Sequence, residues 1–178
     1  DSFAGQTIRM VVRSSFGGPE FGLEFANIQN GTPATFDAVH AALAGTNGAN
    51  GPGSDRTVTF GGHETLTLLP AEHAVSDPVS LDLPALTEVA VSVYLAGKVL
   101  ADTVDEIGLM PAYIVDGNRT AAATLDDPVI TGSYFWLRGL SVPAADEDAG
   151  TIVAFGDSIT EGYATTSGTH RSWPELLA

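Results

Sequence analysis

One serine carries the clearest chemical signal in this sequence of 178 residues. Residues 151–155 form an uninterrupted apolar run, which predicts a strand buried on both faces, as in a parallel sheet covered by helices. Ser158 closely follows that run, and α/β folds place their chemistry just beyond the carboxyl ends of such strands. Gly156 allows a tight turn before it, and the backbone N–H groups that follow can stabilise an oxyanion. A hydroxyl needs a neighbouring base to become a nucleophile, so Ser158 would need a histidine from elsewhere.

The residues around Ser158 also resemble a known motif. The spacing Gly156-x-Ser158-x-Thr160 differs from the G-x-S-x-G nucleophile elbow of α/β-hydrolases, because Thr160 replaces the second glycine. Residues 153–163 instead resemble block I of the SGNH, or GDSL, hydrolase family from end to end. Residues 171–177 resemble the helix that follows block I in bacterial members.

This resemblance implies a serine ester hydrolase that works through an acyl-enzyme and needs no cofactor. Ser158 would be the nucleophile and its own backbone N–H one oxyanion donor, while Gly156 and Asp157 would support the turn. The family's block II glycine, block III asparagine and Asp-x-x-His base cannot be assigned within this chain. We therefore expect a chain truncated shortly after block I, with essentially no turnover alone. The same gene or a second chain would supply the remainder of the catalytic domain.

The family resemblance also gives expectations about substrate and location. Its members act on acetylated sugars, short acyl esters, lipids and phenolic esters, and we expect short acyl or acetyl esters on carbohydrate. A secreted or periplasmic bacterial protein is expected. The alternative function is a non-catalytic β-sandwich that binds carbohydrate or another surface and keeps a vestigial hydrolase segment.

Other residue types near the motif have simpler interpretations. A serine in a turn often caps a helix, and only the flanking match favours a nucleophile at Ser158. Asp157 is expected to orient the turn by accepting backbone N–H groups. His170 lies in a polar loop and the family takes its base from further along the chain, so no catalytic role is expected for it. No metal site is expected, because the remaining histidines lack ligand spacing: His40, His63 and His73.

Residues 1–148 show a different pattern, in which apolar and polar residues alternate. This period of two predicts short strands separated by turns, centred on residues 8–12, 21–25, 58–60, 66–68, 79–83, 89–95 and 134–142. Many short strands at such spacing predict an antiparallel β-sandwich of jelly-roll type. Residues 5–13, 25–27 and 53–62 also resemble the N-terminal β-sandwich of some secreted bacterial SGNH esterases.

We therefore predict a mainly β protein in two parts. A β-sandwich accessory domain covers residues 1–148, and the first strand–loop–helix of an α/β SGNH hydrolase domain covers residues 149–178. The acidic run at 146–148 lacks the ligand pattern of a calcium loop and is interpreted as a solvated linker. Ser172 and Glu175 have capping-box spacing, which predicts a helix beginning there, with Pro174 in its first turn.

Some stretches of the first part are less regular. Residues 45–54 are rich in Gly and Asn and are predicted to form a loop. Residues 99–127 have no firm period, although a helical turn is expected at 104–107. Residues 134–136 (Tyr-Phe-Trp) could stack on a sugar ring, but alternation points Phe135 away from its neighbours, which favours a place in the core.

Charge narrows the range of partners. Seven Lys and Arg stand against 22 Asp and Glu, for a formal net charge of −15. Such a field disfavours nucleic acid and anionic membranes and favours neutral over anionic substrates. No run approaches the roughly 18 apolar residues of a membrane span. Without cysteine the chain has neither disulfides nor Cys-based zinc sites.

Overall fold

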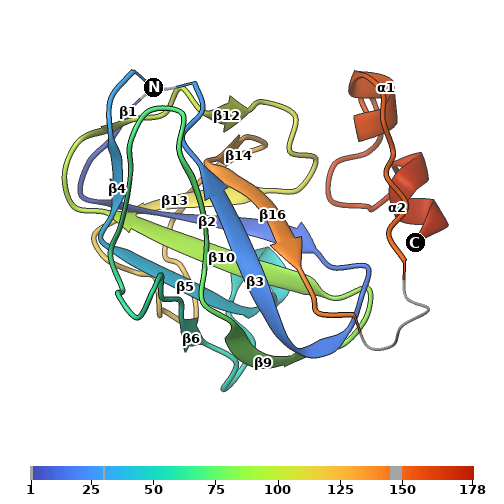
Figure 1. Cartoon of the computed structure of the whole chain (residues 1–178), viewed down its shortest axis with the longest axis horizontal. Coiled ribbons are helices and arrows are strands. Elements are labelled where there is room, and N and C mark those ends of the chain that lie inside the picture. The colour runs from blue at the N-terminus through green and yellow to red at the C-terminus, as the bar shows by residue number, and fades with distance from the viewer. Residues whose placement is uncertain (1, 30, 145–149) are drawn as a thin grey trace.

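The computed structural model describes residues 2–29, 31–144 and 150–178. The fold is mainly β, with antiparallel strands in several sheets (Figure 1). Within the described residues the largest sheet has six strands, in the spatial order β14 (Val129–Thr131), β13 (Ala112–Asp116), β2 (Gln6–Arg13), β10 (Glu88–Leu95), β5 (Ala38–Leu43) and β6 (Arg56–Thr57). β2 and β10 pair along their whole lengths at its centre.

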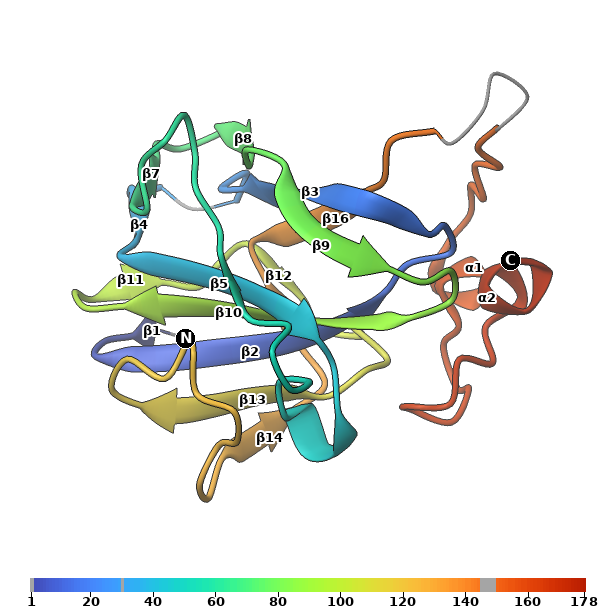
Figure 2. The same cartoon turned by 90° about the horizontal axis from the view of Figure 1, so that it is seen from below.

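A second, smaller sheet forms the opposite layer (Figure 2). It is built around β3, which pairs with three others: β3 (Gly18–Ala26), β16 (Leu137–Ser141), β8 (His73–Val75) and β9 (Val79–Leu83). Phe21, Leu23 and Phe25 of β3 join Ile8 and Met10 of β2 in one buried cluster. The burial of this apolar surface stabilises the two-layer, sandwich-like arrangement, as the alternating pattern predicts. The jelly-roll connectivity stays a prediction.

Short pairs of strands and one 3-10 turn complete the sandwich. The pairs are β1 (Ser2–Phe3) with β11 (Val99–Leu100), β4 (Ala34–Phe36) with β7 (Leu66–Leu68), and β12 (Val104–Asp105) with β15 (Tyr134–Phe135). The turn, η1 (Thr46–Gly48), lies within the loop predicted at 45–54.

The runs of alternating apolar and polar residues predict most of the long strands correctly. Residues 8–12, 21–25, 66–68, 79–83 and 89–95 lie in β2, β3, β7, β9 and β10. In β9 every second residue is buried, which is the signature of a strand with one face on the core. In β9, which has one face in solvent, the alternation of apolar and polar residues in the sequence therefore matches the alternation of buried and exposed residues in the structure.

Residues 99–127 contain three strands that the pattern does not predict, namely β11, β12 and β13. The helical turn expected at 104–107 is wrong, because Val104 and Asp105 extend as β12 and pair with β15. Val104 packs there against the core. Tertiary burial thus decides the local conformation over a stretch too short for a reliable period.

The aromatic run at 134–136 belongs to the core, as alternation favoured. Phe135 and Trp136 are buried, and the Tyr134 hydroxyl donates a hydrogen bond to the carbonyl of Val11. Trp136 has a left-handed φ of 57°, which splits the strand predicted at 134–142 into β15 and β16. Its indole N–H is buried without a hydrogen-bond partner in the described part of the chain.

The polar face predicted for β2 is covered rather than solvated. Arg9 on that face is fully buried. Its Nε donates to Ser92 Oγ at 2.7 Å and one terminal nitrogen donates to the Gly48 carbonyl at 2.8 Å. The other terminal nitrogen contacts three carbonyls of one loop, those of Arg119, Thr120 and Ala122. Burial lowers the pKa of Arg9 to about 10, against the attraction of Asp55, so the side chain stays charged at neutral pH.

Residues 150–178, here called the C-terminal segment, lie beside the sandwich (Figure 1). The strand predicted at 151–155 is wrong for this structure, since those residues form neither helix nor strand. Ile152, Val153 and Phe155 are 77%, 81% and 98% exposed, so this run does not pack onto the sandwich. A strand requires a neighbour for its backbone N–H and C=O groups, and no described strand takes that place.

Two short helices follow in the segment: α1 (Ser158–Glu161) and α2 (Trp173–Leu177). The boundary predicted between residues 148 and 149 and the linker at 146–148 lie outside the described residues. None of the helices in the described ranges has the length and apolar character needed to cross a membrane.

Candidate active site

The turn that carries Ser158 is held by its neighbours. Asp157 precedes α1 as its N-cap, and its Oδ1 accepts the N–H of Ile159 at 3.0 Å. The sequence predicts a contact of this kind, in which the Asp157 side chain accepts a backbone N–H of the turn. Gly156 lies directly against Thr160, where a Cβ would collide with the threonine side chain. Glycine is therefore required here by the close approach of α1.

Ser158 itself is exposed at the first position of α1. Within the described residues its Oγ makes no hydrogen bond and its backbone N–H is unengaged. The hydroxyl is thus accessible to a reagent, but no base that could take its proton contacts it.

His170 lies in the same segment and is fully occupied. Its Nδ1 is 2.6 Å from Glu175 Oε1 and its Nε2 is 2.7 Å from Glu88 Oε1. Burial and nearby Arg13 oppose a charge on the ring, yet the hydrogen bonds to Glu88 and Glu175 and the charge of Glu175 outweigh them and raise the pKa of His170. An imidazole that donates from both nitrogens has no lone pair to act as a base, which agrees with the absence of a predicted catalytic role.

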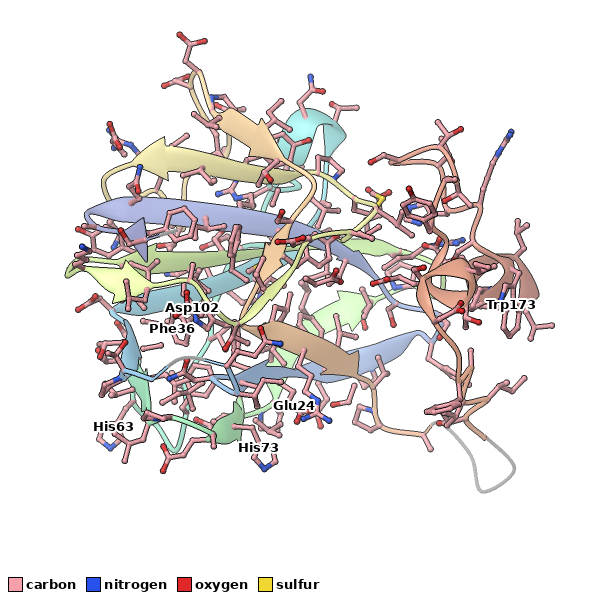
Figure 3. All side chains as sticks on the ribbon, turned by 90° about the horizontal axis from the view of Figure 1, so that it is seen from above. Glu24, Phe36, His63, His73, Asp102 and Trp173 are labelled. Carbon is pink, nitrogen blue, oxygen red and sulfur yellow. The ribbon has the colours of Figure 1, made fainter. Side chains whose placement is uncertain are left out.

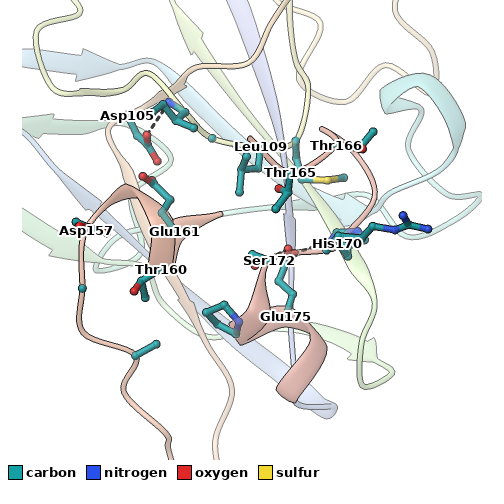
Figure 4. Close-up of a pocket in the computed structure, with 17 residues that line it drawn as sticks. Asp105, Leu109, Asp157, Thr160, Glu161, Thr165, Thr166, His170, Ser172 and Glu175 are labelled. Carbon is teal, nitrogen blue, oxygen red and sulfur yellow. Dashed lines mark hydrogen bonds and ion pairs between the residues drawn. The ribbon is translucent and has the colours of Figure 1, made fainter. Parts of the chain in front are cut away.

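A cleft of about 530 Å³ separates the segment from the sandwich (Figure 4). Asp105 and residues 107–110 form the sandwich side, and the segment contributes Asp157, Thr160 and Glu161 from the α1 region. Ser158 does not line the cleft, although Asp157, Thr160 and Glu161 around it do. The cleft is therefore not an acyl pocket for Ser158.

Two carboxyl groups meet across this cleft. Figure 4 shows the side chains of Asp105 and Glu161 pointing toward one another. Burial, together with the charge and hydrogen bond of Asp105, raises the pKa of Glu161. Two carboxyls this close share a hydrogen bond only when one of them is protonated.

The second helix begins as its capping residues predict. Ser172 is the N-cap of α2 and is buried, and its Oγ donates to Glu175 Oε2 at 2.9 Å. The Ser172 side chain makes no capping hydrogen bond to a backbone N–H of α2, so the capping box is present in spacing but not in its hydrogen bond. Burial raises the pKa of Glu175, but the hydrogen bonds from His170 and Ser172 and the charge of His170 lower it overall. Glu175 thus links the start of α2 to His170.

The other histidines are dispersed over the sandwich. His40 contacts Asp55 at 3.0 Å, and His73 contacts Glu24 at 3.1 Å on a neighbouring strand (Figure 3). In the described ranges, no three His, Asp or Glu side chains are grouped as metal ligands.

The residues that sequence reasoning missed are those of the sandwich that receive the segment, Glu88, Asp105 and Leu109. Asp105 lies 56 positions before Glu161, and Glu88 lies 82 positions before His170. No local spacing or periodicity connects residues so far apart, so only the fold brings them together.

Comparison with known proteins adds no family assignment. No family model matches the chain, and no curated protein matches it. The function must therefore be argued from the chain's own residues.

Proposed function

We propose that this chain carries the nucleophile of an SGNH-type serine ester hydrolase that acts on short acyl or acetyl esters, including those on carbohydrate. The observation that carries the proposal is the exposed, unengaged hydroxyl of Ser158 on a turn held by Asp157 and Gly156. A turn serine that only capped a helix would direct its oxygen to backbone N–H groups, and here Asp157 fills that role.

The proposed reaction has two steps. The Oγ of Ser158 attacks the ester carbonyl carbon while a base takes the hydroxyl proton, and the backbone N–H of Ser158 donates to the oxyanion. The ester C–O bond then breaks, and the alcohol leaves with that proton while the acyl group stays on the serine. Water, deprotonated by the same base, attacks the acyl-enzyme and releases the acid.

The base and the acyl pocket are proposed to come from a remainder of the catalytic domain, in the same gene or in another chain. Two features support this. His170 is committed to two carboxylates, and the apolar side chains of Ile152, Val153 and Phe155 are exposed as if they lacked a covering layer. Docking of that remainder would let residues 151–155 form the buried strand that their composition favours.

The aromatic run at 134–136 does not support the alternative of a carbohydrate-binding module. Phe135 and Trp136, which could have stacked on a sugar, are in the core and only 4% and 2% exposed. We therefore argue only the hydrolase proposal.

The test is the hydrolysis of a short acyl ester, such as p-nitrophenyl acetate, by the protein that the gene encodes. Ser158→Ala should remove the activity, and Ser15→Ala, which changes an exposed serine of the sandwich, should retain it. Equal activity in both variants would refute the proposal. Amide protection in β2, which pairs with β10 and β13, is measured in parallel and shows that each variant is folded.

A further inference from the structure

We propose that the contact between the C-terminal segment and the sandwich is an acid-stabilised latch, in which protonated His170 joins Glu88 to Glu175 and a shared proton joins Glu161 to Asp105. The contacts of His170 with Glu88 and of Glu161 with Asp105 cross the interface between the segment and the sandwich, and the contact of His170 with Glu175 supports it from the segment side (Figure 4). Each of these contacts needs a proton. The inference concerns the docking of the segment and does not depend on the chemistry of Ser158.

The first contact needs a charged imidazole. An ionised carboxylate only accepts hydrogen bonds, so both ring nitrogens of His170 must carry hydrogen to satisfy Glu88 and Glu175 together. The side chain is 17% exposed, which limits its access to water. Loss of the proton leaves a lone pair facing a carboxylate oxygen at 2.7 Å or less, and one of the two hydrogen bonds is lost. The backbone of His170 is also in the left-handed region, at a φ of 51°, a conformation that these contacts help to hold.

The second contact depends on a proton in the same direction. Glu161 on α1 and Asp105 on β12 point toward one another, and Asp105 raises the pKa of Glu161. A hydrogen bond between them exists only while one of the two carboxyls is protonated. When both are ionised the like charges repel at close range. Deprotonation therefore weakens the interface at this point as well.

A third set of contacts does not titrate and provides the readout. The N–H of Gly168 donates to the Leu109 carbonyl at 2.8 Å, and Ser167 Oγ donates to the same oxygen at 2.7 Å. A Cβ on Gly162 would lie 2.8 Å from the Leu109 side chain, so segment and sandwich are in close contact there. The Gly168 amide is therefore protected from exchange only while the segment is docked.

The sign of the pH dependence follows from the groups around the latch. His170 faces Glu88 of β10, Glu175 of α2 and the charge of Arg13 on β2, while Glu161 faces Asp105. Glu88 and Asp105, which belong to the sandwich, help to raise the pKa values of His170 and Glu161 through their contacts with the segment. Docking is therefore favoured at lower pH and weakens as pH rises through those pKa values. The pKa of Glu175 is lowered, so its contribution is lost in stronger acid. The latch is strongest between these limits, in mild acid.

Tyr134 lies near the same carboxylates, but its hydroxyl does not change protonation state over the pH range in which the latch acts. Burial and the charges of Asp105, Glu175 and Glu88 raise its pKa, so its hydroxyl stays protonated throughout the working range of the latch. It therefore adds no pH dependence there.

The experiment is amide hydrogen exchange of Gly168 in the whole chain, followed by NMR at about pH 5.5 and about pH 8 and corrected for intrinsic exchange rates. The protection factor should be several-fold higher at the lower pH. His170→Gln should remove most of that difference by losing protection in acid. Glu161→Gln, whose amide can donate to Asp105 at any pH, should raise protection at the higher pH.

His73→Gln is the matched control, because His73 pairs with Glu24 on the surface of the sandwich, away from the segment that carries Trp173 (Figure 3). It should behave as the unmodified chain does. The latch is wrong if the protection factor of the Gly168 amide is the same at both pH values in the unmodified chain. It is also wrong if His170→Gln keeps the full difference in that protection factor between the two pH values. Protected amides in β2 and β10 confirm that each variant is folded.

Discussion

Replacing Arg9 with methionine should destabilise the sandwich strongly. Methionine keeps much of the apolar stem of the side chain but removes the guanidinium that connects β2 to two loops. Three of its hydrogen bonds are fully buried, those to Ser92 Oγ and to the carbonyls of Gly48 and Thr120. The serine hydroxyl can rotate to another partner, whereas the two carbonyls cannot.

The expected cost follows from those two acceptors. A buried polar group left without a partner costs about 1–3 kcal/mol, so two carbonyls together cost about 2–6 kcal/mol. For a domain of this size each kcal/mol lowers the melting temperature by about 2–4 °C, which gives a decrease of about 8–16 °C at the middle of that range. Arg9→Lys should recover little of the loss, because an ammonium cannot reproduce the fork of donors.

The assay is urea and thermal unfolding followed by circular dichroism, with Arg138→Met as the control. Arg138 is 59% exposed and lies 3.8 Å from Glu24, so its removal should change stability by less than about 0.5 kcal/mol. If Arg9→Met unfolds at the same urea concentration as Arg138→Met, the assignment of Arg9 as an anchor of the covered face is wrong.

Three smaller features give further predictions. Asp157→Ala removes the cap of α1 and should lower the local stability of that turn by about 1 kcal/mol in hydrogen exchange, while Asp157→Asn should retain it. Trp136→Phe removes a buried indole N–H that has no partner among the described residues, so it should lower the free energy of unfolding in urea by less than about 1.5 kcal/mol. Trp136→Ala should lower it by about 3–5 kcal/mol. Thr59→Ala removes the main hydrogen bond that, with the N–H groups of Gly62 and Gly61, lowers the pKa of Asp77, so that pKa should rise in an NMR titration. The stability that Asp77 contributes is lost as pH falls through its lowered pKa, and the variant should lose it at higher pH.

Each of these has a clear contrary result. Unchanged exchange in Asp157→Ala would mean that backbone contacts alone hold the turn. A loss in Trp136→Phe as large as that in Trp136→Ala would mean that the indole N–H has a partner. A titration of Asp77 that does not respond to Thr59→Ala would remove the hydroxyl as the source of its lowered pKa.

Long strands with alternating residues were predictable from sequence, including β2 and β10, which are buried on both faces, and short strands were less so. Phe21, Leu23 and Phe25 alternate with less buried residues, which predicts β3 and its inward face. β13 does not alternate, since Ala112 and Tyr113 are both buried, and a run so short has no readable period. The same cause hides the burial of Arg9, because loops distant in sequence cover its face.

For the candidate site, sequence predicts local geometry and fails at long range. The cap by Asp157 and the start of α2 at Ser172 are set by neighbours within three residues, and both are as predicted. The apolar composition of 151–155 favours a buried strand, but pairing partners decide whether a strand forms, and none among the described residues pairs with it. The contact of His170 with Glu88 spans 82 positions and carries no sequence signal.

The central claim is that Ser158 is the residue that attacks an acyl group. The most direct measurement is to treat the protein that the gene encodes with a fluorophosphonate, digest it, and locate the adduct by mass spectrometry. We expect the phosphonyl group on the peptide containing Ser158, and no adduct in Ser158→Ala. An adduct on a different serine, with Ser158 unmodified, would contradict the account.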